Sequence, residues 1–145
     1  MQKKVWGILT GCVLTFIISG CCCDKVKLSK DEITLLKSNQ DIVISAETGE
    51  IKGSDADKKG IKKACKNCGY PEGSLRQQLI LNGGKNLDAE TLQKLKEKKD
   101  VVISGKTGAV KDTEKDKTPS TELCPDCGQP KGSLKSSIFH MMQGD

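Results

Sequence analysis

The chain has 145 residues with a formal charge of +5, of which 30% are charged, 3% are aromatic and eight are cysteine. That length allows one domain or two very small ones. Two of the four aromatic residues, Trp6 and Phe16, lie near the N-terminus, so only Tyr70 and Phe139 are left for the rest of the chain. This excludes a large aromatic core. Because small domains commonly need disulfides or metals for stability, the cysteines are the first residues to explain.

The N-terminal segment has the pattern of an export signal. Lys3 and Lys4 precede an apolar run from Val5 to Ile18, and the small residues Ser19-Gly20 follow it. A charged region, an apolar region and a small-residue cleavage zone in this order are typical of a signal peptide. The run to Gly20 is shorter than the roughly 20 residues that a helix needs to cross a membrane. We predict a signal peptide over residues 1–20.

The string Ile18-Ser19-Gly20-Cys21 resembles the lipobox of bacterial lipoproteins, with an aliphatic residue at position −3, small residues at −2 and −1, and cysteine at +1. The resemblance implies a lipidated N-terminus at Cys21, with diacylglycerol on the sulfur and further acyl chains of the palmitate type. One acyl chain anchors a protein only marginally, at about 0.8 kcal/mol per buried methylene, whereas two or three chains anchor it durably. The alternative is an ordinary signal peptide that a cysteine triplet happens to follow.

The lipobox implies a location as well as a modification. It implies a protein anchored by lipid to the cell membrane or the outer membrane, facing the periplasm or the exterior, with residues 21–27 as the tether. Neither Cys22 nor Cys23 has the lipobox residues in register before it. These two cysteines stay open to extra acylation, to a disulfide or to no modification.

A tandem repeat follows the tether. A constant offset superposes residues 28–84 on residues 87–143 without a gap, and a third of the paired positions are identical. Two copies are too few for a solenoid, which usually needs three or more units. We therefore expect repeat 1 over residues 28–86 and repeat 2 over residues 87–145, paired with each other as one pseudo-symmetric unit.

Each repeat has the start signals of two short helices. Ser29 and Glu32 have capping-box spacing before the first helix of repeat 1, and Asp88 is the corresponding cap in repeat 2. Ser74 and Ser133 can each cap a second helix near the end of the repeat. We predict a short helix after each of these caps.

Strand signals lie between the helices. The β-branched runs at residues 42–45 and 101–104 are each followed by a Thr-Gly turn and a second apolar stretch, which predicts a β-hairpin in each repeat. Residues 53–63 and 112–122 are rich in charged and small polar residues, so we predict solvated loops there. The expected fold class is α+β, with each repeat made of a short helix, a β-hairpin, a cysteine knuckle and a short helix.

A CxxCG knuckle occurs once in each repeat, at Cys65 and Cys68 and again at Cys124 and Cys127. Two cysteines separated by two residues bring both sulfurs to one point, and the glycine after the second cysteine supplies the positive φ of such a turn. One knuckle offers two sulfurs, whereas a tetrahedral structural site takes four. We therefore expect the four cysteines to form one cluster.

The knuckles resemble those of zinc-ribbon and rubredoxin-type proteins, in which two CPxCG-like turns surround zinc or iron. The strings Cys68-Gly69-Tyr70 and Cys124-Pro125-Asp126-Cys127-Gly128 carry this resemblance. It implies a structural metal held by the four knuckle cysteines, and ligand softness with tetrahedral geometry favours one zinc ion over iron. A rubredoxin-like iron electron carrier is an alternative.

Export favours a different state of the same four cysteines. Outside the cytoplasm thiols tend to become disulfides, and four cysteines allow three pairings. A bridge between the repeats would close a loop of about 60 residues and stabilise the fold by roughly 4 kcal/mol in the chain-entropy model. No cofactor is expected in that state. Thiol-disulfide exchange at the CxxC pairs, the chemistry of an envelope redox protein, is a further alternative.

Other catalytic and nucleic-acid-binding signals are weak. His140 is the single histidine, and we interpret it as a surface residue at a helix end. Removal of the signal takes away Lys3 and Lys4, which lowers the formal charge to +3, with the two signs interleaved and no aromatic stacking platform. We therefore expect a non-enzyme that does not bind nucleic acid. Its expected partners are membrane lipid through the acylated Cys21 and an envelope or surface protein that the sequence does not identify.

Overall fold

The computed structural model describes residues 27–82 and 87–142. The predicted signal peptide, the Cys21 anchor and most of the tether lie outside the described residues. The elements in chain order are α1 (Lys30–Lys37), β1 (Ile42–Ile44), α2 (Asp55–Lys58), α3 (Leu75–Asn82), α4 (Ala89–Lys96), β2 (Val101–Ile103), α5 (Glu114–Lys117) and α6 (Leu134–Met142). Short helices thus accompany a two-stranded antiparallel sheet, which confirms the α+β class. Residues 27–82 are called the N-terminal half and residues 87–142 the C-terminal half.

The helices α1, α3, α4 and α6 begin where the sequence predicts. The Ser29 hydroxyl accepts the Glu32 amide and the Glu32 carboxylate accepts the Ser29 amide, so α1 has the full capping box. Asp88 caps α4 through its side chain. The hydroxyls of Ser74 and Ser133 accept amide hydrogen bonds from the first turns of α3 and α6, at 3.2 and 3.3 Å. Each cap of this kind contributes about 1 kcal/mol.

The two strands pair across the halves. β1 runs antiparallel to β2, in the register Ile42↔Ile103, Val43↔Val102 and Ile44↔Val101. The predicted hairpins are present only as an isolated bridge in each half, Ile44↔Ile51 and Ile103↔Val110. The principal ladder therefore joins segments far apart in the sequence. The β-branched pattern predicts that a segment is a strand, but it carries no information on which strand is its partner.

Two one-turn helices lie in the segments that the composition assigns to solvated loops. Ser54 caps α2 by accepting the Asp57 amide, and Thr113 caps α5 by accepting the Asp116 amide. Neither helix contains a buried residue. The segments are therefore solvated as expected, but side-chain caps fold part of each into a helical turn.

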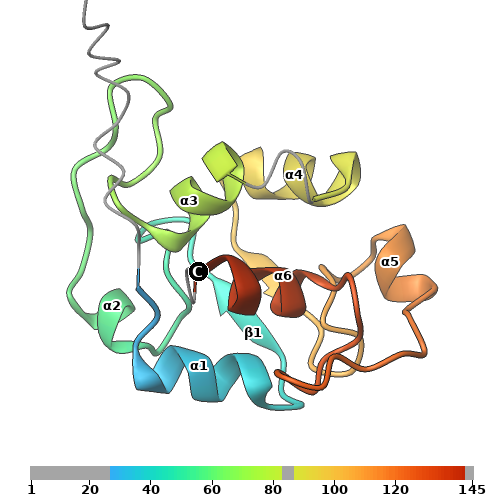
Figure 1. The fold of residues 1–145 in the computed structure, drawn as a ribbon. Helices are drawn as coiled ribbons and strands as arrows, with labels where there is room; N and C mark the ends of the chain where they lie inside the picture. The colour runs from blue at the N-terminus through green and yellow to red at the C-terminus, as the bar shows by residue number, and fades with distance from the viewer. Residues whose placement is uncertain (1–26, 83–86, 143–145) are drawn as a thin grey trace, which may run out of the picture.

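Helix packing also crosses between the halves. α1 packs against α6 and α3 packs against α4, and in Figure 1 α3 and α4 lie together on one side of the molecule, with α1 below α6 on the other. The buried members of the main core come from both halves; they are Leu36, Ile42, Ile44, Ile51, Leu75, Leu79, Leu95, Val101, Ile103, Val110, Leu134 and Ile138. Because full burial of one such side chain contributes about 1.5–3 kcal/mol, each half depends on the other for its core.

Two buried cations add hydrogen bonds between the halves. Arg76 on α3 donates to two backbone carbonyls just beyond the end of α4, at 2.8 and 2.6 Å. Lys135 on α6 donates to two carbonyls just beyond the end of α1, both at 2.8 Å. Both side chains are almost completely buried, and burial lowers the pKa of each. Since the last carbonyls of a helix lack partners and carry partial negative charge, each half caps the first helix of the other.

Two aspartates beside the strands link the halves at the surface. Asp41 accepts the Gly105 amide at 2.7 Å and pairs with Lys111 at 2.5 Å. Asp100 makes the matching contacts in the opposite direction, with an amide of the N-terminal half at 2.8 Å and with Lys52 at 2.5 Å. These contacts lower the pKa of both carboxyl groups. Exposed pairs of this kind contribute little net stability because water screens them, so they fix the register of the sheet more than they stabilise it.

Candidate metal centre

Both knuckles fold into the same tight turn. The Gly128 amide donates to the Cys124 carbonyl at 2.8 Å, and the Gly69 amide donates to the Cys65 carbonyl at 2.8 Å. Gly69 and Gly128 have φ angles of 74° and 70°, in the left-handed region where glycine has no steric penalty. The prediction that these glycines supply a positive φ is confirmed.

The knuckle of the C-terminal half lies against a histidine. The donor atoms of Cys124, Cys127 and His140 all lie within 4.8 Å of one another, and Cys124 Sγ is 3.1 Å from His140 Nε2. Both cysteines are buried and His140 is exposed. His140 lies near the end of α6, so this group connects the turn to the helix that follows it.

Phe139 holds the group against the N-terminal half. Its ring forms a small buried cluster with the two knuckle cysteines, and Ile33 of α1 packs on that cluster. The ring stands edge-on to the His140 imidazole, with the centroids 5.6 Å apart and an angle of 89° between the planes. The Lys37 ammonium lies 5.2 Å from the Phe139 centroid, within cation–π range. The candidate site therefore lies at the interface between α1 and α6, in a packed environment.

The two thiols of the group differ in acidity. Hydrogen bonds from the backbone amide of Cys127 and then from the His140 ring lower the pKa of Cys124 to about 6. Burial raises the pKa of the Cys127 thiol. At neutral pH Cys124 is therefore mainly thiolate, whereas Cys127 keeps its proton until a cation displaces it. Thiolate is the form of cysteine that binds metals.

The donor set fits a soft divalent ion. Two cysteine sulfurs and one imidazole nitrogen are ligands that zinc takes in tetrahedral sites, at about 2.3 and 2.0–2.1 Å respectively. The sulfurs disfavour hard cations such as magnesium and calcium. A tetrahedral ion takes four ligands, and this group supplies three. Cys124, Cys127 and His140 can thus hold a metal ion with one further ligand.

Cys65 and Cys68 do not belong to this group. Cys65 is disulfide-bonded, whereas Cys68, Cys124 and Cys127 are thiols, so none of the three pairings among the knuckle cysteines forms. Gln77 donates to Cys68 Sγ at 3.4 Å. The observed group therefore differs from the four-cysteine cluster that the sequence predicts, because it uses one knuckle and adds a histidine. Cys12 and the Cys21–Cys23 triplet lie outside the described residues.

His140 is the candidate ligand that sequence reasoning missed. The interpretation as a surface residue at a helix end is correct for its exposure, but its ring contacts Cys124. The missed signal is spacing, because the interval from Cys127 to His140 falls in the range found between the second cysteine and the first histidine of Cys₂His₂ zinc sites. In the N-terminal half the same position is Leu81, which is 45% exposed.

Comparison of the chain with protein-family models, with curated proteins and with solved structures finds no match. None of the helices within residues 27–82 and 87–142 is long and apolar enough to cross a membrane.

Proposed function

We propose that the chain is a lipid-anchored envelope protein whose folded part is a non-catalytic, structural or binding module with a zinc site. The observation that carries the metal site is the 3.1 Å contact between Cys124 Sγ and His140 Nε2, with the Cys127 sulfur in the same group. The anchor is inferred from the lipobox that ends at Cys21. In this proposal zinc ties the knuckle turn to α6 and to the α1 surface against which both pack.

We also propose that the module consists of two repeats, residues 28–86 and 87–145, folded as one pseudo-symmetric unit. The gap-free superposition of one repeat on the other supports this organisation. So do the matching contacts at corresponding positions, since Arg76 and Lys135 hold corresponding helix ends of the opposite halves. The function of the pairing is to complete a core that neither repeat can bury alone.

The zinc proposal is tested by native mass spectrometry of the purified full chain after exposure to one equivalent of zinc. We expect one zinc ion per chain in the wild type and loss of zinc in Cys127→Ser. Cys68→Ser is the matched control, because it alters the same position of the other knuckle, and it should keep the ion. A wild-type protein without zinc, or equal loss of zinc in both variants, contradicts the proposal. A visible absorption band in the protein as purified would instead indicate an iron centre.

The anchor is tested separately by expressing the full chain in a bacterium supplied with labelled palmitate. We expect label in the wild type and none in Cys21→Ala, while Cys22→Ala and Cys23→Ala should keep it. An unlabelled wild-type protein, or label that persists in Cys21→Ala, contradicts the lipidation site without affecting the zinc proposal.

A second candidate function, thiol-disulfide exchange, is favoured by the unequal acidity of Cys124 and Cys127. The low pKa of Cys124, about 6, makes it the attacking thiolate, and Cys127 is placed to resolve the mixed disulfide. In that sequence Cys124 attacks a substrate disulfide and releases one substrate thiolate. Cys127 then loses its proton and attacks Cys124, which releases the second substrate thiolate and leaves a Cys124–Cys127 disulfide. The substrate is reduced by the two electrons that the pair loses.

The redox candidate is tested by reduction of insulin with dithiothreitol as the terminal reductant. Turnover above the uncatalysed rate that disappears in Cys124→Ser would support exchange. A rate equal to that of buffer would reject it. Because zinc and a disulfide compete for the same sulfurs, addition of zinc should inhibit any activity that is found.

A further inference from the structure

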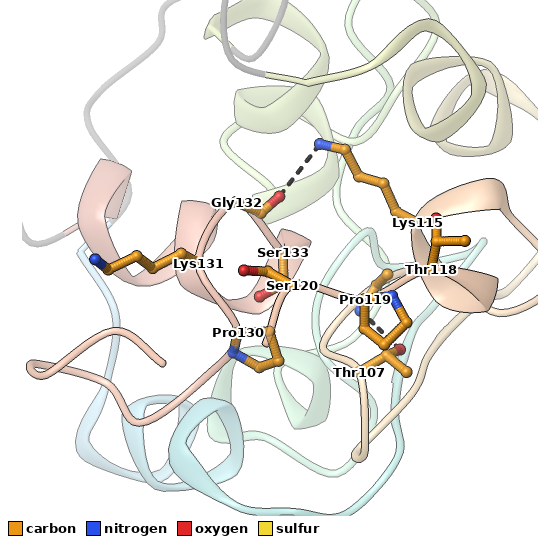
Figure 2. A pocket seen from close by; sticks show the side chains of 10 residues that line it. Thr107, Lys115, Thr118, Pro119, Ser120, Pro130, Lys131, Gly132 and Ser133 are labelled. Carbon is orange, nitrogen blue, oxygen red and sulfur yellow. Dashed lines mark hydrogen bonds between the residues drawn. The ribbon is translucent and has the colours of Figure 1, made fainter. Parts of the chain in front are cut away.

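A pocket of about 240 Å³ lies in the C-terminal half beside the start of α6. It is formed by the turn at Thr107 and Ala109, the loop that follows α5, and residues 130–133 after the knuckle (Figure 2). Its lining includes Lys115 and Lys131 but no acidic residue. It is smaller than the pockets of about 300–1,000 Å³ that hold drug-sized ligands, so its size suits a small molecule or ion.

The corresponding region of the N-terminal half contains a carboxylate of the chain itself. Glu50 stands at the position of Ala109, and its side chain is 1% exposed. One carboxylate oxygen accepts the amide of Leu75, the first residue of α3, at 3.3 Å. The other pairs with the Lys62 ammonium at 3.1 Å. Burial raises the pKa of Glu50, and the amide and the ammonium oppose this rise by stabilising the carboxylate.

A second amide of the N-terminal half is also satisfied by a side chain. The Gly73 amide donates to Gln77 Oε1 at 2.7 Å. In the C-terminal half the shorter Ser136 stands at the position of Gln77. The amides of Gly132 and Leu134, which correspond to those of Gly73 and Leu75, have no acceptor within the residues that the structure describes. Both amides flank Ser133, a residue that lines the pocket.

The two lysines that line the pocket already have partners. The Lys115 ammonium donates to the Gly132 carbonyl at 3.2 Å (Figure 2) and lies 3.3 Å from Asp88. Lys131 pairs with Glu122 at 2.9 Å. Both lysine side chains are about half exposed, so these pairs are weak in water. The Lys115 ammonium reaches Gly132, whereas the Lys131 side chain extends away from the pocket (Figure 2). The start of the nine-residue α6 adds the partial positive charge of a helix N-terminus.

We propose that this pocket binds a small carboxylate from solution, held by the Gly132 and Leu134 amides and by Lys115. The chain's own Glu50 carboxylate, at the same place in the other half, is the template for this assignment. In the N-terminal half the anion is the side chain of Glu50. In the C-terminal half Ala109 stands at that position and leaves room for a carboxylate that exchanges with solution. The site goes beyond the proposed metal centre, since none of its groups is a candidate metal ligand.

The proposal is tested by amide NMR of the full chain titrated with sodium acetate, with sodium chloride at equal ionic strength as the reference. We expect saturable shifts of the Gly132 and Leu134 amides with acetate that chloride does not produce. No such shifts would overturn the proposal. Larger and tighter shifts with sodium phosphate would overturn the carboxylate assignment in favour of phosphate.

Variants that carry the residue of the other half at a corresponding position sharpen the test. Ala109→Glu supplies the carboxylate within the chain, so the acetate-dependent shifts should disappear and the two amides should shift as they do in acetate-saturated wild type. Lys115→Ala should weaken acetate binding at least 3-fold, whereas Ala56→Lys, at the corresponding position of the N-terminal half, should leave it within 2-fold. Acetate binding that is undiminished in a folded Ala109→Glu protein would contradict the proposal.

Discussion

The two knuckles of this protein have the same backbone and different chemistry. Each is a CxxCG turn closed by the amide of the glycine, with a φ of 74° in one and 70° in the other. In the C-terminal half the turn lies beside His140, and Cys124 and Cys127 are thiols. In the N-terminal half Leu81 replaces the histidine, Cys65 is disulfide-bonded and Cys68 accepts a hydrogen bond from Gln77.

The turn alone therefore does not define a metal site. The turn fixes two sulfurs, and the third donor comes from the helix that follows it. The two knuckles therefore differ in two features that a metal site needs, a histidine at that helix position and a thiol at the first cysteine.

Exchange of the histidine between the halves should have the largest effect. His140→Leu gives the C-terminal knuckle the residue of the N-terminal one, and we expect zinc affinity to fall by roughly 100-fold or more, since even loss of an outer-shell partner costs 10–100-fold. Competition with a chromophoric zinc chelator measures this change.

Leu81→His, which gives the N-terminal knuckle the histidine of the C-terminal one, is the matched variant to His140→Leu. It should not raise the zinc stoichiometry above one while Cys65 is disulfide-bonded, because only one sulfur of that knuckle is then a thiol. After mild reduction a second zinc ion should bind. Unchanged affinity in His140→Leu would show that the histidine is not a ligand.

Removal of the buried cations should destabilise the fold strongly. Arg76→Met removes the guanidinium hydrogen bonds to the Glu97, Lys99 and Ile44 carbonyls. Because a hydrogen bond to a charged group contributes about 1.5–3 kcal/mol, we expect a loss of about 2–4 kcal/mol in the free energy of unfolding. Lys135→Met, which removes two such bonds, should cost about 1–3 kcal/mol. Urea unfolding followed by circular dichroism measures both.

The exposed Lys111→Met is the control for these two variants. It removes a surface pair with Asp41 and should lower the free energy of unfolding much less than either buried-cation variant, because water screens exposed pairs. If all three variants lose the same stability, the hydrogen bonds of the two buried cations do not hold the halves together.

The free energy of unfolding of the metal-free protein should also depend on pH. The pKa of Cys124 is lowered from 9.0 to about 6 in the folded state, so its contribution to stability is fully present above pH 9 and is lost as the pH falls through about 6. Between pH 6 and 8 the free energy of unfolding should therefore rise with pH. Urea unfolding in the presence of a chelator measures this slope.

Cys124→Ser should remove this pH dependence, and Cys68→Ser should retain it. Ultraviolet thiolate absorbance of the folded wild type should titrate with a midpoint near pH 6, and that step should be absent in Cys124→Ser. A first thiol midpoint above pH 8 would contradict the assignment of Cys124 as the acidic thiol.

Local features of the fold were predictable from the sequence. Ser29, Asp88, Ser74 and Ser133 mark helix starts because a side-chain oxygen that satisfies a helix amide leaves a local pattern. The glycine of each CxxCG turn was predictable because only glycine takes a positive φ without strain. These features depend on residues within a few positions of one another.

The remaining features depend on contacts between distant residues. Nothing near Ile42 or Val101 in the sequence indicates that their strands pair with each other. Arg76 and Lys135 resemble ordinary helix-surface cations until the fold brings helix ends from the opposite half against them. The contact of His140 with Cys124 requires α6 to fold back on the knuckle, and only the spacing of the two residues hints at it.

X-ray absorption spectroscopy of the zinc-loaded full chain is the sharpest test of a zinc site made by Cys124, Cys127 and His140, because it counts the sulfur and nitrogen ligands of the ion. We predict two sulfurs at about 2.3 Å and at least one imidazole nitrogen at about 2.0–2.1 Å, with the imidazole signal lost in His140→Leu. Four sulfurs and no nitrogen would contradict it and would support a cluster of all four knuckle cysteines.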